Sequence, residues 1–184
     1  MSITSSRIAK TTRFYRKLHK WVAIPLLVFF FLIGATGFLL GLKKHTGLLP
    51  PTLKGISADS KQWLPVDSLV IIAGNYAQST LKKSGSIDRI DIRPGKGIAK
   101  IVYADHFTEL QLDCTTGSVL SVKTRTSDII EKIHDASILD FLINTKNEQF
   151  KLVYTFTLSV GLMLLSLSGF FLWFNPIRIK KGNK

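Results

Sequence analysis

The stretch RFYRKLHKWVAIPLLVFFFLIGATGFLLGLKKH, residues 13–45, begins with cations and then runs from Trp21 to Leu42 without a charge. As a helix, this run would span roughly 30 Å, which is the thickness of the hydrocarbon core of a bilayer. A second uncharged run, LVYTFTLSVGLMLLSLSGFFLWF, occupies residues 152–174. We therefore expect two membrane-spanning helices, at 21–42 and 150–174, with Pro25 in the first turn of the first one.

The first run is read as an uncleaved membrane anchor rather than a secretory signal. The apolar core of a signal peptide has roughly 7 to 15 residues and ends in a small-residue cleavage site. Here the run is longer, no A-x-A-like sequence follows it, and cations come immediately after it. The first helix is therefore expected to remain in the mature protein.

The charges predict an orientation. The tails, 1–20 and 175–184, contain ten cations and no acid, whereas all twelve acidic residues lie between the two apolar runs. Short basic flanks stay in the cytoplasm, so both tails are expected inside and the central region outside. The formal net charge of +13 is thus mostly membrane-flanking, which favours the lipid bilayer as partner and excludes nucleic acid.

The central region, 43–126, predicts a small α+β domain. LPVDSLVIIAGNYAQSTLKKSG, residues 64–85, has apolar positions at helical spacing. After it, SIDRIDIRP, IAKIVYAD, TELQLDC and SVLSVKTR alternate with period two and are separated by short turns. This pattern indicates one helix and about four antiparallel strands, with one sheet face covered by the helix and the other free. Asp105 and Glu109 are accordingly expected to be solvated, and Cys114 to lie in the core.

The segment 127–149 reads as an amphipathic helix and connector near the outer membrane surface. Ser127 or Asp128 suits its start, and isoleucines recur at helical spacing in TSDIIEKIHDASILDFLI. The spacing leaves open whether this helix lies on the membrane or packs on the domain. The fold class expected for the chain is therefore a membrane α+β protein, a two-helix transmembrane hairpin with an inserted domain.

Several segments together resemble the PepSY-associated transmembrane helix proteins of bacteria. They are RKLHKWVAIPLL, GATGFLLGLKKH, LPPTLKGIS, IDRIDIRPGKGIAKI, ELQLDCTTGSVL, IIEKIHDASILD and LSLSGFFLWFNPIRIKK. The resemblance covers nearly the whole chain and implies a location in the bacterial inner membrane, with a PepSY-like helix-plus-sheet domain in the periplasm. Larger relatives look like reductases that release iron from siderophores and hold b-type haems through histidine, but this chain has two spans and no flavin or nicotinamide module.

The resemblance implies a role as an accessory or binding module linked to iron or haem uptake. The alternatives are a dimeric haem b electron-transfer subunit of a ferric-siderophore reductase type of system, and a module that restrains a peptidase. No catalytic residue and no metal site is expected in the chain, because it has one Cys and no H-E-x-x-H, phosphate-loop or G-x-S-x-G element.

Three histidines, His19, His45 and His134, fall near the predicted membrane boundaries. They suit either the headgroup level of a membrane or ligation of haem b, because neutral imidazole is a common iron ligand. His45 and His134 would be the outer pair. His19 would need a second copy of the chain, so that a homodimer or larger complex is implied. His106, in the turn ADHFT, is expected to be exposed to solvent.

Small residues in the two apolar runs predict close helix packing. Gly37 and Gly41 form a G-x-x-x-G pair in the first run, and Ser159, Ser166 and Gly169 are small positions in the second. Such positions let helix backbones approach each other in lipid. Packing within one chain and self-association are both open from the pattern.

Overall fold

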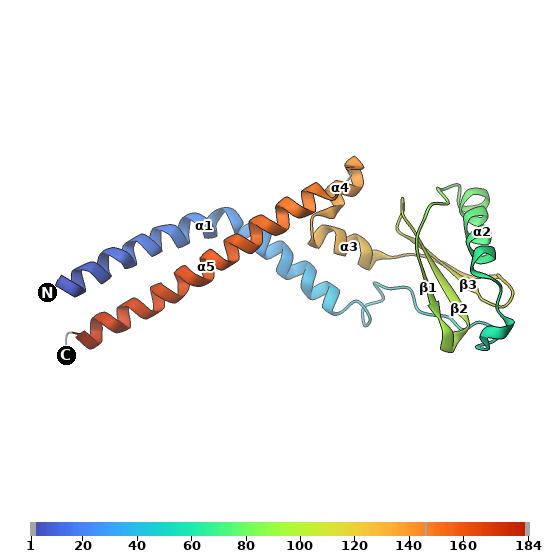
Figure 1. The fold of residues 1–184 in the computed structure, drawn as a ribbon, viewed down its shortest axis with the longest axis horizontal. Helices are drawn as coiled ribbons and strands as arrows, with labels where there is room; N and C mark the ends of the chain where they lie inside the picture. Colours follow the sequence, from blue (N-terminus) through green and yellow to red (C-terminus); the bar gives the residue numbers. More distant parts are fainter. Residues whose placement is uncertain (1–2, 146, 183–184) are drawn as a thin grey trace. The chain divides into compact units, whose positions relative to one another are not determined.

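The computed structural model describes residues 3–145 and 147–182. They form two compact units: a helical unit, with residues up to Phe38 and from Lys132 onward, and a sheet unit from Leu39 to Glu131. The helices are α1 (Ile3–Gly41), α2 (Val66–Tyr76), α3 (Thr126–His134), α4 (Ser137–Ile143) and α5 (Gln149–Gly182). The strands are β1 (Ile87–Arg93), β2 (Ile98–Tyr103), β3 (Thr108–Asp113) and β4 (Val119–Thr124) (Figure 1).

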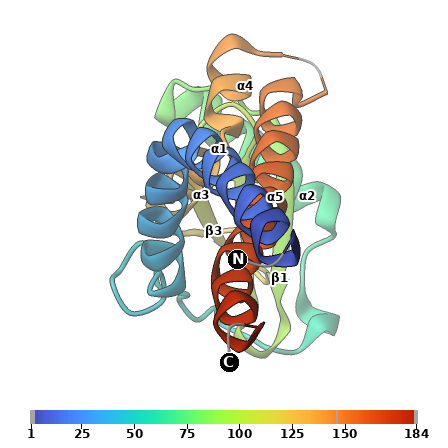
Figure 2. The same cartoon turned by 90° about the vertical axis from the view of Figure 1, so that its left-hand side faces the viewer.

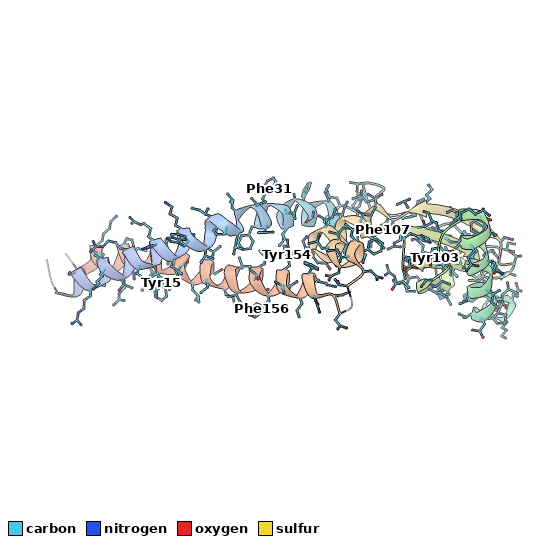
Figure 3. All side chains as sticks on the ribbon, turned by 90° about the horizontal axis from the view of Figure 1, so that it is seen from above. Tyr15, Phe31, Tyr103, Phe107, Tyr154 and Phe156 are labelled. Atoms are coloured by element: carbon cyan, nitrogen blue, oxygen red, sulfur yellow. The ribbon has the colours of Figure 1, made fainter. Side chains whose placement is uncertain are left out.

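α1 and α5, with 39 and 34 residues, are long and apolar enough to cross a membrane by length and composition. Only 11% of the most apolar 18-residue stretch of α1 is buried, and only 17% of that of α5, whereas the core helix of a soluble protein is mostly buried. Phe31 and Phe156 point away from the helical unit and are 77% and 70% exposed (Figure 3). The two helices therefore display their apolar surface instead of burying it.

The prediction that Pro25 lies in a first helical turn is wrong, because α1 begins at Ile3 and the basic segment is part of the same helix. Pro25 therefore stands in the helix interior. There it has no N–H to donate to the carbonyl of Trp21, and its ring crowds the preceding turn, which bends a helix. In Figure 1, α1 changes direction between its dark-blue and light-blue halves.

α5 runs antiparallel to α1 and packs against it through aromatic and small residues. The ring of Tyr15 stacks on that of Phe171 at 4.5 Å between centroids, and Phe29 meets Tyr154 edge-on at 5.8 Å. A Cβ atom on Gly161 would overlap a leucine side chain of α1, so the helices approach closely there. The beginning of α1 and the end of α5 lie at one end of the helical unit (Figure 2).

The sheet unit confirms the predicted helix and four antiparallel strands. The strands follow one another in the order β1-β2-β3-β4, and each pair is antiparallel. α2 covers one face of the sheet, and the hydroxyl of Tyr103 on β2 donates a hydrogen bond of 2.9 Å to the carbonyl of Ala73 on α2. The buried core between them consists of Leu69, Ala73, Ala77, Ala99, Ile101, Tyr103, Leu110, Leu112 and Cys114.

The other face of the sheet is also covered, so the prediction that it is free is wrong. Residues 50–57, here called the strap, bond to side chains of β3. The N–H of Leu53 donates to Gln111 Oε1 at 3.0 Å, and Gln111 Nε2 donates to the carbonyl of Pro51 at 2.9 Å. The N–H of Ile56 donates to Asp113 Oδ2 at 2.6 Å. The amide and carboxylate groups of this face therefore bind the strap instead of water.

Two glycines allow the strap to lie close to the β1–β2 turn. Gly97 has a φ of +63°, and a Cβ atom there would overlap the carbonyl oxygen of Ser57. Gly55 donates its N–H to the carbonyl of Lys96 at 2.8 Å. A side chain at Gly97 would therefore be strained in its backbone and would also displace the strap.

A charged cluster is buried beside the strap, and it corrects the prediction that Glu109 is solvated. Glu109 is 1% exposed. Its carboxylate contacts Lys100 Nζ at 3.1 Å and Arg125 Nη1 at 2.5 Å. Arg125 also donates from Nε to Asp128 at 2.6 Å. Burial works to lower the pKa of Arg125, but its bonds to Asp128 and Glu109 raise the pKa above the ordinary value overall.

Asp113 should make the sheet unit sensitive to acid. Burial works to raise the pKa of Asp113, but hydrogen bonds from the backbone of Ile56, Thr116 and Thr115 lower it below its ordinary value overall. A carboxyl whose folded-state pKa is lowered contributes stability above its unfolded pKa of about 4, and this is lost as the pH falls through the folded pKa. We expect the urea concentration at the midpoint of unfolding to decrease as the pH falls below about 4.

Asp113→Asn should lower the urea midpoint at pH 7 and flatten its dependence on pH, because the amide cannot accept all the bonds and no longer titrates. Asp88→Asn serves as the control, because Asp88 is half exposed and pairs only with the equally exposed Arg89. An Asp113→Asn protein with the same acid dependence as the Asp88→Asn protein would contradict this assignment.

The segment 127–149, predicted as one helix with a connector, holds two helices: all of α3 except its first residue, Thr126, and all of α4, and it ends at the first residue of α5. The carboxylate of Asp140, on α4, accepts hydrogen bonds from the first N–H groups of α5, at 3.1 Å from Phe150 and 2.9 Å from Lys151. It also accepts a hydrogen bond from the hydroxyl of Thr145. Asp140 thus caps α5 from outside the helix and fixes how α4 meets it.

Candidate functional site

His19 lies against two small residues of α5. Its Nδ1 atom is 2.9 Å from the hydroxyl of Ser168, and its Cε1 atom lies 3.8 Å from the position that a Cβ of Gly169 would take. Ser168 is 1% exposed. The ring therefore fits into the space that the glycine leaves beside α5.

His134 has the same surroundings, built from the other long helix. Its Nδ1 atom is 2.8 Å from the hydroxyl of Thr36 on α1, and its Cε1 atom lies 3.5 Å from the Cβ position of Gly37. In both niches a histidine meets a hydroxyl residue that is followed immediately by glycine. The helical unit therefore holds two matched histidine niches, one formed with α5 and one with α1.

The hydroxyl partners favour one tautomer of each imidazole. Ser168 donates its single hydroxyl hydrogen to the carbonyl of Leu164 at 2.7 Å, and Thr36 donates to the carbonyl of Leu32 at 2.7 Å. A hydroxyl that donates to its own backbone carbonyl can only accept from the histidine, and in that arrangement Nδ1 carries the proton and Nε2 keeps its lone pair. In the described residues, neither Nε2 has a hydrogen-bond partner. A free Nε2 beside a hydrogen-bonded Nδ1 is the arrangement of a histidine that ligates a metal.

The two niches are separated along α1. Thr36, which contacts His134, follows His19 by seventeen positions, which corresponds to about 25 Å along a helix. His19 and His134 of one chain cannot therefore ligate the same metal atom.

A pocket of about 380 Å³ lies beside His134 in the helical unit. Its polar lining includes His134, Asp135 and Tyr154, whose hydroxyl is buried and has no hydrogen-bond partner in the described residues. Tyr154 lies between α1 and α5 in Figure 3. The apolar walls of the pocket are formed by Phe30, Ile33, Leu158 and Leu162. An apolar pocket with a few convergent polar groups is the usual form of a small-molecule site.

The other two histidines differ from this pair. His45 lies in the sheet unit, in the turn after α1, with an exposed side chain and no ring hydrogen bond among the described residues. His106 is partly buried, which corrects the prediction of full exposure. Its Nε2 is 3.1 Å from the carbonyl oxygen of Ser84, and its ring lies 4.6 Å from that of Tyr103. His106 therefore has a structural role in the β2–β3 turn.

Cys114 lies in the core, as its place in the alternating pattern predicted. It is fully buried in the core of the sheet unit. Burial, with a smaller contribution from the neighbouring Asp113 carboxylate, raises the pKa of the Cys114 thiol. Among the described residues, no group of three or more His, Cys, Asp or Glu side chains is placed to hold a metal ion.

The sequence pattern did not identify the hydroxyl residues that contact the histidines. Gly37 and Gly169 stand out as small residues, and both are used in packing within the chain. Thr36 and Ser168 carry no such signal, because a hydroxyl in an apolar helix usually bonds to its own backbone. The repeated hydroxyl–glycine pair is the one feature that links the two niches. A scan against protein-family models and searches of curated proteins and of solved structures find no significant match to this chain.

Proposed function

We propose that this chain is a two-pass inner-membrane protein of the PepSY-associated type, with cytoplasmic termini and its sheet unit, a PepSY-like domain, in the periplasm. Three observations support the proposal. α1 and α5 expose their apolar residues, they run antiparallel, and the described parts of the two tails, 3–20 and 175–182, whose charged residues are all cations, lie at the same end of the helical unit. A membrane satisfies the apolar surface, and the basic end remains in the cytoplasm.

Of the functions that the sequence leaves open, a haem b electron-transfer subunit is the one that the geometry favours over an accessory module without a cofactor. The observation that carries it is the matched pair of niches: His19 and His134 each have Nδ1 held by a hydroxyl and Nε2 free. An interfacial histidine needs no such restraint. The two niches, at His19 and Thr36 of α1, lie about 25 Å apart along that helix, which suits two haem groups near opposite faces of the membrane.

The donor set fits b-type haem, with one condition. Neutral imidazole is a common axial ligand of haem iron, and an apolar pocket adjoins His134. Each niche contributes one imidazole, so bis-histidine ligation requires a second one. A second copy of the chain would supply it for His19. For His134, the second ligand would be His134 of a second copy.

The chain's own residues would do three things. Ser168 and Thr36 keep Nδ1 protonated, so that each Nε2 lone pair is available without a change of tautomer. Gly169 and Gly37 leave room for the imidazole rings beside the helices. The apolar walls of the pocket would shield one side of a bound group from water and lower the local dielectric constant there. Bound haem b would supply one-electron transfer.

The absorption spectrum of detergent-purified protein tests this function. Protein from cells supplied with iron and haem precursor should show sharp low-spin bands on reduction. His19→Ala and His134→Ala should each remove about half of the haem, and His106→Ala should remove none. Thr36→Val keeps the shape and the imidazole but removes the acceptor, so it should weaken haem retention at one niche by about 10- to 100-fold. Colourless wild-type protein would contradict the proposal.

The accessory and peptidase-restraining functions become the better candidates if the protein is colourless. The observation in favour of them is that β1 and β4 each pair with one neighbour, so both edges of the sheet are free of strand partners in the described residues. An extended peptide binds to such an edge by adding a strand.

A further inference from the structure

A groove of about 370 Å³ runs along one side of α1 near its bend and is distinct from the histidine niches. Its lining residues are Lys17, Lys20, Trp21, Ile24 and Pro25. Counted from Lys17, the other four stand three, four, seven and eight positions later, which places all five on one face of a helix. Trp21 and Ile24 are 70% and 61% exposed, so the apolar part of the groove is open to the surroundings.

The groove has a polar end and an apolar end. Lys17 and Lys20 lie toward the N-terminus of α1, where the charged part of the helix stops, and Trp21 begins the uncharged run. Side chains on a helix lean toward its N-terminus, so both ammonium groups extend away from the apolar end. In an inserted α1, the lysines would stand at the headgroup level, and Ile24 and Pro25 among the acyl chains.

Among the described residues, the two lysines of this end have no counter-ion. No acidic residue precedes Asp59, and in the described part of the chain neither Lys17 nor Lys20 forms an ion pair. Two adjacent ammonium groups favour an anion, and the apolar end favours a hydrocarbon chain directly attached to it. A zwitterionic headgroup would place its own cation near the lysines, which costs part of the attraction.

We propose that this groove binds an anionic phospholipid, with the phosphate between Lys17 and Lys20 and an acyl chain along Trp21 and Ile24. The inference goes beyond haem ligation and rests on the membrane insertion proposed above. The attraction of a basic residue to an anionic lipid corresponds to about a fivefold preference for each lysine. The site should therefore select phosphatidylglycerol over phosphatidylcholine by fivefold or more, by that estimate.

Quenching of Trp21 by brominated lipids measures this preference directly. The full chain carrying Trp63→Phe and Trp173→Phe is reconstituted into vesicles that contain brominated phosphatidylglycerol or brominated phosphatidylcholine in increasing proportion. We expect brominated phosphatidylglycerol to quench Trp21 at an at least fivefold lower proportion, by the same estimate. Trp173, kept alone in a second protein, is 65% exposed at the same end of the helical unit and should show no such preference.

Two double variants separate the groove from the general basic charge. Lys17→Gln with Lys20→Gln should abolish the preference of Trp21. Arg16→Gln with Lys180→Gln removes the same charge from outside the groove and should preserve it. Millimolar inorganic phosphate should leave the preference unchanged, because a free anion lacks the acyl chain.

Each contrary result has a separate meaning. Equal quenching of Trp21 by both lipids, or an equal loss in both double variants, would overturn the lipid site and leave membrane insertion standing. Loss of the preference in phosphate would assign the lysines to a free anion and overturn the lipid site. No quenching by either lipid would overturn the lipid site together with the insertion of α1.

Discussion

Replacing Leu112 with aspartate should unfold the sheet unit. Leu112 is fully buried between α2 and the sheet, in one cluster with Leu69 and Ile101. The variant loses a buried leucine and places a carboxylate where the core offers no partner, which together cost about 5 kcal/mol or more. A domain of this size has a total stability of about 5 to 15 kcal/mol, so the folded population should be small.

The thiol of Cys114 reports this unfolding in the full chain without a further label. It is the only cysteine in the sequence, and it is buried in the same cluster as Leu112. In the wild-type protein a thiol reagent should react slowly with Cys114. In Leu112→Asp it should react with Cys114 as fast as it does in urea-denatured protein. Leu112→Met conserves volume and should remain protected, with a cost of less than about 1.5 kcal/mol. Protection of Cys114 in Leu112→Asp would show that the faces of β3 are wrongly assigned.

Replacing Glu109 with alanine should lower the free energy of unfolding of the sheet unit by about 3 to 5 kcal/mol. Glu109 is the carboxylate that Lys100 and Arg125 share, and all three side chains are largely buried. Its removal leaves Lys100 without any ion pair in the described residues and Arg125 with Asp128 alone. The cost is the penalty of a buried, unpaired cation, because Lys100 is only 6% exposed and water cannot solvate it well.

Trp63 gives the readout for this change in a Trp21→Phe, Trp173→Phe protein. It packs against the core of the sheet unit, and its Nε1–H donates to the strap carbonyl of Ser57 at 3.0 Å. Asp88→Ala removes an acid whose pair with Arg89 is half exposed, and should change the free energy of unfolding by less than about 1 kcal/mol. Urea curves with the same midpoint for Glu109→Ala and Asp88→Ala would mean that the charged cluster contributes no stability.

The strap has a consequence for how the sheet unit is attached. It joins the end of α1 to α2, and its bonds to Gln111 and Asp113 hold it on the sheet. At the end of the domain's sequence, the N–H of Ser127 donates a hydrogen bond of 3.0 Å to the carbonyl of Leu48, which precedes the strap. The chain that enters the sheet unit is thus bonded to the chain that leaves it. In the proposed function, this hydrogen bond would join the two chain segments that connect the domain to the membrane-spanning helices.

Local patterns in the sequence determined the elements of this protein. The two uncharged runs predicted the long apolar helices, and the strict alternation in segments such as TELQLDC predicted the strands and the buried side of β3. Periodicity suffices for these features because each depends on residues within one helix or one strand. The basic residues before Trp21 were outside the predicted helix, however, because an uncharged run marks a membrane boundary and not a helix end.

Tertiary structure alone decided what each polar side chain meets. Glu109 alternates with Leu110 in the same way whether its face is solvated or covered, and only the strap and Arg125 distinguish the two cases. His19 and Ser168 lie 149 residues apart, and their contact depends on how α1 and α5 pack. Alternation and charge are properties of neighbouring residues, whereas a hydrogen-bond partner is set by the register of segments far apart in the chain. For this reason the histidines could be singled out from the sequence, while Thr36 and Ser168, which orient them, could be found only in the folded protein.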